Sequence, residues 1–167
     1  MQTIKIGRRQ IGENEPVYFI ADIASNHDGD LERAIMLIEK SAEAGADAAK
    51  FQLFEADTIV SERGFEGLQI GHQAGWGDTV YKTYQKYSLD PEWTPYLATH
   101  CNNLGIDFLC TPYSLEAIDY LDPYVMMYKI GSGDITWLEF IRQVACKCKP
   151  IILSTGASTA EEIQIAI

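Results

Sequence analysis

Residues 17–53, which read VYFIADIASNHDGDLERAIMLIEKSAEAGADAAKFQL, decide the fold of this chain. The apolar run that starts at Val17 predicts a strand. Asp30 has the side chain of a helix N-cap, apolar residues follow it at helical spacing, and Gly45 is a residue type that ends helices. The apolar run 48–53 predicts a second strand. Two strands joined by one helix predict a right-handed βαβ unit with parallel strands.

The same alternation continues along the rest of the chain. It predicts strands at 108–111, 124–130 and 150–153 and helices over 90–103, 115–121, 137–147 and from Thr159, which forms a capping box with Glu162. Strands alternating with helices indicate a parallel α/β fold. We predict a (β/α)8 barrel of the TIM type, of which roughly the first five units are present, because a closed barrel needs at least ~200 residues. A small open sheet is the alternative.

Two segments depart from this alternation. Residues 1–16 are polar and predict a short hairpin or cap before the first core strand. Residues 54–88 contain five glycines and several aromatic residues. A long insertion after a barrel strand lies on the active-site face, so we interpret this one as a substrate-covering loop with some helix. A disordered or packing loop is the alternative.

Composition excludes several classes of protein. A net charge of -11 argues against nucleic acid and anionic membranes as partners, and is typical of a solvated helical surface. No run approaches the ~20 apolar residues of a membrane span, and no signal peptide is visible at the N-terminus. Four cysteines without a disulfide framework indicate reduced thiols, so we expect a cytoplasmic protein. The pair Cys146 and Cys148 is a weak metal motif without a partner pair.

Two lysines stand where cations are unexpected, after or within apolar strand segments. Lys50 and Lys129 are placed to bind an anionic group, because active sites of parallel barrels lie at the C-terminal ends of strands. Ser132 and Ser154 add hydroxyl donors beside glycines that let backbone N–H groups approach. This pattern predicts a phosphate or carboxylate site. A buried structural lysine paired with an aspartate is the alternative.

Acidic residues and histidines supply the other candidate groups. Asp22 and Asp134 also follow strands and are candidates for acid–base chemistry or for orienting a polyol. His27 is a candidate proton donor, metal ligand or helix cap, and His72 in the long loop is a candidate substrate contact. One convincing histidine is too few for a His₂–carboxylate triad, so we predict no metal site within this chain.

At these same residues the chain resembles the sialic acid synthase family, the phosphoenolpyruvate (PEP)-dependent synthases of N-acetylneuraminate and related nonulosonic acids. The resemblance covers the chain from about Val17 onward, with matching order and spacing. It is carried by the segments IADIASNHDGD (20–30), AGADAAKFQ (44–52), CTPY (110–113), YKIGSGDIT (128–136) and ILSTG (152–156).

The resemblance implies an enzyme that condenses PEP with the open-chain aldehyde of an N-acetylated amino sugar and releases phosphate. A divalent metal, Mn²⁺ or Mg²⁺, polarises the aldehyde, with ligands outside this chain. Residues 1–167 are then the N-terminal part of the barrel domain, without its later strands or the C-terminal antifreeze-like domain, and the full-length protein is a homodimer. We expect the 167-residue piece alone to be inactive and aggregation-prone, because its last strand exposes an unpaired edge.

Residue by residue, the resemblance divides the site into two halves. The PEP half is Lys50, Gln52, Thr111, Lys129, Ser132 and Ser154. Asp22 matches a family glutamate that transfers a proton or activates water, and His27 is the second candidate catalytic residue. Asp134 matches a family glutamate that contacts the sugar, and Asn26 and His72 are further candidate sugar-binding residues.

The chain departs from the family pattern at the two aspartates, at Ala24 and in lacking the later strands, and two alternative functions stay open. Asp22 and Asp134 are each one methylene shorter than the family glutamates, and a proton-transfer group set back by ~1 Å can cost on the order of 100-fold in rate. Ala24 replaces a usual glycine. The alternatives are a Schiff-base aldolase that uses Lys129 or Lys50, and a non-catalytic sugar- or phosphate-binding relative. The sequence does not distinguish among mannosamine derivatives, their 6-phosphates and bacillosamine-type sugars as the second substrate.

Overall fold

The computed structural model describes residues 3–7, 9–66 and 75–167. The strands are β1 (Ile4–Ile6), β2 (Arg9–Ile11), β3 (Ile20–Ala24), β4 (Ala48–Leu53), β5 (Asp107–Pro112), β6 (Tyr128–Ile130) and β7 (Ile151–Leu153). The helices are α1 (Leu31–Glu43), α2 (Ala56–Ile59), α3 (Glu62–Phe65), α4 (Val80–Tyr87), α5 (Thr94–Asn103), α6 (Leu115–Leu121), α7 (Leu138–Ala145) and α8 (Ala160–Ala166), with 3₁₀ turns η2 (Pro91–Trp93) and η3 (Ser132–Asp134).

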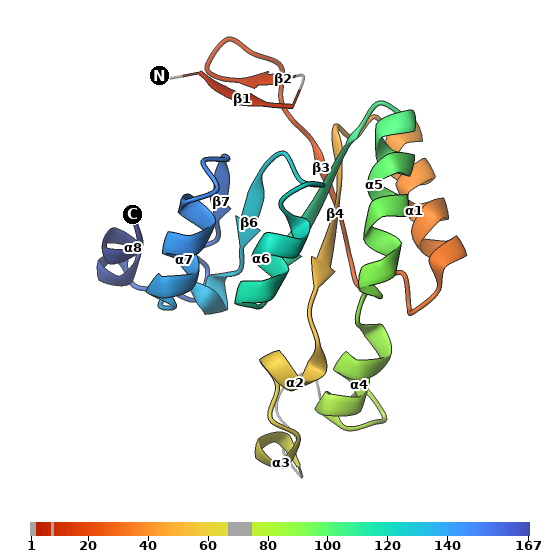
Figure 1. Ribbon diagram of the computed structural model, residues 1–167, viewed down its shortest axis with the longest axis vertical. Helices are drawn as coiled ribbons and strands as arrows, with labels where there is room; N and C mark the ends of the chain where they lie inside the picture. Colours follow the sequence, from red (N-terminus) through yellow and green to blue (C-terminus); the bar gives the residue numbers. More distant parts are fainter. Residues whose placement is uncertain (1–2, 8, 67–74) are drawn as a thin grey trace.

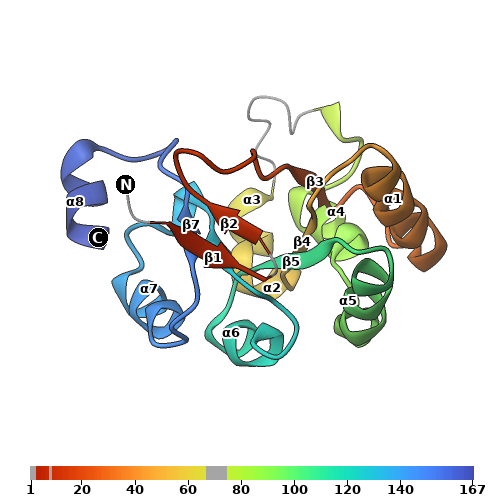
Figure 2. The same ribbon diagram turned by 90° about the horizontal axis from the view of Figure 1, so that it is seen from above.

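Strands β3 to β7 are parallel where they pair and lie in chain order. β3, β4 and β5 form one three-stranded sheet, and β6 pairs with β7 in a second. β5 and β6 are neighbours without a shared hydrogen-bond ladder. Seen from above, α1, α5, α6, α7 and α8 form an open arc outside the strands (Figure 2). The predicted parallel α/β fold is confirmed, and the described residues form an arc that does not close into a barrel.

The strands separate an outer core from an inner surface, because successive residues of a strand point to opposite faces. The outer face packs against the helices, where the Phe51 and Phe108 rings stack with centroids 5.7 Å apart. Ile38 of α1 and Leu97 of α5 are fully buried in the same cluster. The inner face holds a smaller cluster of Ile6, Ala48, Leu109 and Met127. Lys50 and Gln52 alternate with Phe51 in β4 and therefore share the inner face with Ala48.

The N-terminal hairpin closes one end of the inner face. β1 and β2 pair antiparallel, as the polar segment predicted, and Ile6 is buried in the inner cluster. Arg9 forms an ion pair with Asp47 at the start of β4, and the Tyr18 hydroxyl donates to Asp107 at 2.6 Å. The hairpin lies at the opposite end of the sheet from α2, α3 and α4 (Figure 1). The carboxyl ends of the strands are therefore left for the long insertion.

The insertion after β4 forms short helices in its described part, residues 54–66 and 75–88. These are α2, α3 and α4, and they lie beyond the carboxyl end of β4 (Figure 1). Helix within this segment, on the side of the strand ends, is as predicted. His72 lies outside the described residues. The substrate-covering role of the segment stays a prediction.

Strands β3 and β6 begin three and four residues later than the apolar runs predicted. The run from Val17 becomes strand only at Ile20, because the backbone N–H of Phe19 donates to the Asp47 carboxylate rather than to a neighbouring strand. The run 124–130 becomes strand only at Tyr128. The N–H groups of Tyr124 and Val125 instead donate to the Leu121 carbonyl and end α6.

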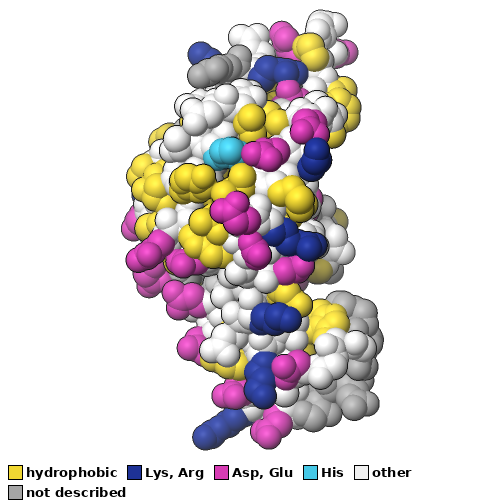
Figure 3. Space-filling model, turned by 90° about the vertical axis from the view of Figure 1, so that its right-hand side faces the viewer, with side chains coloured by type: hydrophobic (Ala, Val, Ile, Leu, Met, Phe, Trp, Pro, Cys, Tyr) yellow, Lys and Arg dark blue, Asp and Glu magenta, His cyan; other side chains and the backbone are white. Residues whose placement is uncertain are grey.

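Helix boundaries follow the predicted capping residues closely. The Asp30 side chain accepts from the N–H of Arg33, and Gly45 adopts the left-handed backbone (φ +85°) that follows the end of α1. The Thr159–Glu162 capping box is present. Acidic and basic side chains are interspersed over the face formed by α1 and α5 (Figure 3). Within the described ranges, none of the helices has the length and apolar character needed to cross a bilayer.

Candidate active site

Inward-facing polar side chains meet near the carboxyl ends of the parallel strands. Strand register places Asp22 of β3 opposite Lys50 of β4, and Gln52 of β4 opposite Thr111 of β5. Lys129 is the central residue of β6. These five residues come from four neighbouring strands, so the topology collects residues from distant parts of the chain at one edge.

Lys50 is a buried cation held by one carboxylate. Its Nζ donates to Asp22 Oδ1 at 2.6 Å, and its side chain is only 8% exposed whereas that of Asp22 is 64% exposed. The structure therefore contains the lysine–aspartate pair that was one alternative for this residue. An ammonium carries three N–H donors, and among the described residues Asp22 is the only acceptor hydrogen-bonded to this one. Two donors are left for an anionic ligand.

Lys129 and Asp134 lie in the same electrostatic environment. Burial lowers the pKa of Lys129, and the positive charge of Lys50 lowers it further, against the opposing effects of Asp22 and Asp134. Burial raises the pKa of Asp134, with Lys129 acting in the opposite direction. The site thus brings together two cations and two carboxylates, and a bound anion would favour the charged form of Lys129.

The turns after β6 and β7 add small polar residues. Gly131 allows the Asp134 carboxylate to approach, because a Cβ at this position would lie 2.9 Å from Asp134 Oδ2. Ser132 Oγ lies 4.0 Å from the Cβ position of Gly156 in the turn after β7. The N–H of Ser154 donates to the Ile130 carbonyl at 3.1 Å, which places Ser154 directly beyond the β6–β7 pair. The predicted hydroxyl donors therefore lie on the β6 and β7 side of the site.

Thr111 is fully buried, and its hydroxyl has no hydrogen-bond partner among the described residues. A buried hydroxyl without a partner is costly, by roughly 1–3 kcal/mol. Since Thr111 faces inward beside Gln52, this orphaned group fits a site that a ligand would complete.

Sequence reasoning missed Tyr113 as a site residue. Gln52 Nε2 donates to the Tyr113 hydroxyl at 3.0 Å, and Ser25 Oγ donates to Gln52 Oε1 at 3.4 Å. This chain of side chains links the loop after β3 to the end of β5. Two signals were in the sequence: Tyr113 comes directly after a strand that carries Thr111, and it ends the CTPY segment that carries the family resemblance.

His27 lies apart from the other predicted catalytic residues. It has no exposed surface, and its ring packs against Phe51 and Trp93 with centroids 6.3 and 6.0 Å away. Its Nδ1 accepts from the N–H of Gly29 at 3.1 Å. Phe51 belongs to the outer core, so the structure places His27 with the helices and not with Lys50. This geometry favours a structural role and gives its predicted catalytic role no support.

His27→Gln is expected to flatten the pH dependence of stability. Burial lowers the pKa of His27 in the folded state below the ordinary value of 6.5. As the pH falls below 6.5, the unfolded chain gains a proton that the folded chain resists, so wild-type stability falls. The variant lacks this loss of at most about 1.4 kcal/mol per pH unit. Urea unfolding of the full-length protein at pH 7.5 and 5.5 measures the change in the free energy of unfolding between the two pH values. An equal change in the wild type and in His27→Gln would contradict the prediction.

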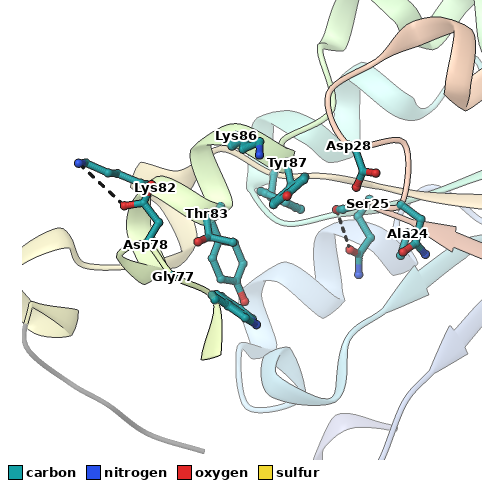
Figure 4. Close-up of a pocket in the computed structure, with 14 residues that line it drawn as sticks. Ala24, Ser25, Asp28, Gly77, Asp78, Lys82, Thr83, Lys86 and Tyr87 are labelled. Atoms are coloured by element: carbon teal, nitrogen blue, oxygen red, sulfur yellow. Dashed lines mark hydrogen bonds and ion pairs between the residues drawn. The ribbon is translucent and has the colours of Figure 1, made fainter. Parts of the chain in front are cut away.

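A cleft of about 740 Å³ lies beside the charged cluster. Ser25 and Asp28, from the loop after β3, form one side, and Thr83, Lys86 and Tyr87 of α4 face them (Figure 4). Gln52 also lines this cleft and connects it to Tyr113. The insertion thus forms a wall of a concave surface next to the site.

Asn26 lines the same cleft, although its side-chain Nδ2 donates to the Ile23 carbonyl at 2.8 Å. The part of the chain that the structure describes contains no cluster of three or more His, Cys, Asp or Glu side chains able to hold a metal ion. Cys146 and Cys148 are exposed free thiols. The described residues thus bring two lysines and two carboxylates together, without such a cluster.

Comparisons of this chain with known proteins agree on one family. The NeuB family matches residues 37–167. An N,N'-diacetyllegionaminic acid synthase from Legionella pneumophila is 35% identical over 96% of this chain and 46% of its own length. The chain thus spans about half the length of the curated relatives it matches.

Solved structures agree with the fold. The sialic acid synthetase from Leptospira borgpetersenii superposes with a TM-score of 0.81 at 27% identity, over 99% of this chain and 53% of that chain. A truncated 3-deoxy-D-arabino-heptulosonate 7-phosphate synthase from Thermotoga maritima superposes with a TM-score of 0.66 at 14% identity, over 99% of this chain and 50% of that chain. At 14% identity, the second match supports the barrel-type fold alone.

Proposed function

Because the chain belongs to the NeuB family, we propose that its full-length protein condenses PEP with the open-chain aldehyde of an N-acetylated amino sugar. The products are a nonulosonic acid and inorganic phosphate. The relatives in this family include synthases of legionaminic and pseudaminic acids. Since the chain spans about half of their length, the proposal concerns the whole protein and not these 167 residues alone.

The observation that supports the proposal is the group of polar side chains on the inner face of the strands, with Lys50 and Lys129 near its centre. The positive charge of Lys50 lowers the pKa of Lys129, and the unpartnered hydroxyl of Thr111 lies on the same face. Two lysines beside a free hydroxyl suit a small, highly charged ligand such as PEP, which carries a phosphate and a carboxylate. We assign Gln52, Ser132 and Ser154 to the same half of the site. Their hydroxyl and amide groups would bind oxygens of PEP.

The carboxylates suit the second half of the reaction. Asp22 accepts a hydrogen bond from Lys50, which would keep it beside an anion bound to that lysine, where it would take a proton or activate water. Burial raises the pKa of the Asp134 carboxyl, and the charge of Lys129 opposes this shift. We assign Asp134 to the amino sugar, together with Asn26 in the adjoining cleft. We also assign His72 to the amino sugar, as the sequence predicts.

The metal remains part of the proposal. A bound Mn²⁺ or Mg²⁺ would polarise the sugar aldehyde. The described residues offer no set of ligands for it, so we assign its ligands to other parts of the full-length protein. The cytoplasmic location and the homodimer likewise stay predictions.

The test is a coupled assay on the full-length protein. PEP is offered with N-acetylmannosamine, its 6-phosphate or a diacetylated bacillosamine-type sugar, and phosphate release is followed. We expect release only when PEP and one of these sugars are both present, and none from the 167-residue piece. PEP binding by calorimetry without release in any combination would instead indicate a non-catalytic relative.

One observation favours a second candidate, the Schiff-base aldolase. Amine catalysis needs an uncharged lysine, and burial together with Lys50 lowers the pKa of Lys129. Borohydride trapping with a keto acid separates the two reactions. A covalent adduct at Lys129 would support the aldolase, whereas its absence alongside PEP-dependent phosphate release would support the synthase.

A further inference from the structure

Tyr113 projects from the end of β5 across the site toward the turn after β6. Its ring packs edge-on against Phe54, with centroids 6.0 Å apart, and its hydroxyl lies 3.8 Å from the Cβ position of Gly131. Asp134 Oδ2 lies 2.9 Å from that same position. The Tyr113 hydroxyl and the Asp134 carboxylate therefore flank a point that the glycine leaves empty.

The hydrogen bonds of the Tyr113 hydroxyl leave its proton available. The oxygen accepts from Gln52 Nε2 at 3.0 Å, and the Gln52 carbonyl in turn accepts from Ser25. Among the described residues, no acceptor takes the phenolic proton. A phenol can donate one hydrogen bond while accepting another, so this proton is available to a partner other than these residues.

The hydroxyl remains a donor across the working pH range. Burial, followed by the negative charges of Asp134 and Asp22 and by nearby Tyr84, raises the pKa of Tyr113 to about 12. The same surroundings indicate the charge of its partner. Two carboxylates near the hydroxyl would repel the oxygens of an anion, whereas a neutral hydroxyl or amide oxygen is accepted there.

We propose that the Tyr113 hydroxyl donates a hydrogen bond to an oxygen of the neutral amino sugar, and so is a further substrate-binding residue of the site. Tyr113 supplies the donor and Asp134 the acceptor, and a sugar hydroxyl can satisfy both at once. The Ser25–Gln52 chain holds the phenol in position. This inference rests on the proposed function, because it requires a polyhydroxylated second substrate.

The test is Tyr113→Phe in the full-length protein, with whichever amino sugar turns over. The variant removes the proposed hydrogen bond to the sugar and also the one that the hydroxyl accepts from Gln52. Loss of the bond to the sugar is expected to raise the KM for the sugar about three- to tenfold. The KM for PEP is expected to stay within about twofold, and the thermal unfolding midpoint to stay unchanged. Tyr120→Phe is the matched control, since that hydroxyl donates to the Pro91 carbonyl outside the site.

A second measurement identifies the contacted oxygen. Sugar analogues that each lack one hydroxyl or carbonyl oxygen are compared on the wild type and on Tyr113→Phe. For the contacted oxygen, the analogue binds both enzymes equally, because the hydrogen bond is already absent. For every other oxygen, the ratio of the two KM values stays that of the intact sugar.

Several outcomes overturn the inference. An unchanged KM for the sugar would remove Tyr113 from substrate binding. A rise confined to PEP would transfer the contact to the anion, and equal rises for both substrates with a lower unfolding midpoint would make the role structural. If the wild type turns over, each of these outcomes leaves the proposed function intact. If no sugar turns over on the wild type, the proposed function and the inference fail together.

Discussion

Lys129→Met in the full-length protein is expected to lower kcat/KM for PEP by about 100-fold or more. In the proposed complex Lys129 forms a charge pair with bound PEP. Removing one partner of a buried charge pair costs about 2–5 kcal/mol, which corresponds to a loss of roughly 30- to several-thousand-fold. The fold is expected to survive, because burial already disfavours the charged form of Lys129 and methionine has a similar length. Steady-state kinetics with PEP as the varied substrate measure the effect.

The same variant has a second readout in the titration of Asp134. Lys129 holds the pKa of that carboxyl below the value that burial alone would set. Removing the lysine is therefore expected to move any pH-rate limb due to Asp134 to higher pH. Lys40→Met is the control, because Lys40 pairs with Glu43 on the surface of α1. A KM for PEP that is unchanged in Lys129→Met would exclude Lys129 from the anion site.

Lys129 is a cleaner target than Lys50. Lys50 is almost completely buried and is ion-paired with Asp22, so its removal would also take away the partner of a candidate catalytic residue. A loss of activity in a Lys50 variant would then have two explanations. Lys129 makes no such ion pair among the described residues.

Asp22→Asn is expected to lower kcat by about 100- to 10,000-fold, the range typical of losing a general acid or base. Asparagine keeps an oxygen that can accept from Lys50 Nζ, so the position of the lysine and the KM for PEP should change much less than kcat. Rapid-quench measurement of phosphate release would show whether the chemical step has slowed.

The control for this variant is Asp119→Asn, which changes a carboxylate paired with Lys147 at the surface. It is expected to have wild-type kcat. Asp22→Glu restores the length of the family glutamate and is expected to retain far more activity than Asp22→Asn. Wild-type kcat in Asp22→Asn would remove this carboxylate from the reaction.

Much of the secondary structure was predictable because local rules specify it. The boundaries of β4 and α6 are those of the apolar run and the helical spacing in the sequence. The Asp30 and Thr159 caps depend on side chains that bond to their own helix, so a short window of sequence contains all that is needed. The predicted strand starts at Val17 and Tyr124 were wrong. Near these starts, backbone N–H groups donate to the distant Asp47 side chain or to the preceding Leu121 carbonyl instead of to a neighbouring strand.

Part of the candidate site was predictable for a similar reason. Side chains alternate along a strand, so Lys50 and Gln52 had to share one face and Phe51 the other. Parallel strands joined by helices align their carboxyl ends, which made a meeting of Asp22 and Lys50 a reasonable expectation. The sequence already contained the two lysines and the carboxylates in this order.

By itself, then, the sequence determined the parallel α/β order, the capped helices and the collection of charged residues at the strand ends, because each depends on periodicity or on nearest neighbours. Only the tertiary structure decided which way individual loop side chains point. It buried His27 between Phe51 and Trp93, and it joined Gln52 to Tyr113, which is far away along the chain. Such contacts depend on how distant elements pack, and packing is a property of the whole fold that no local pattern specifies.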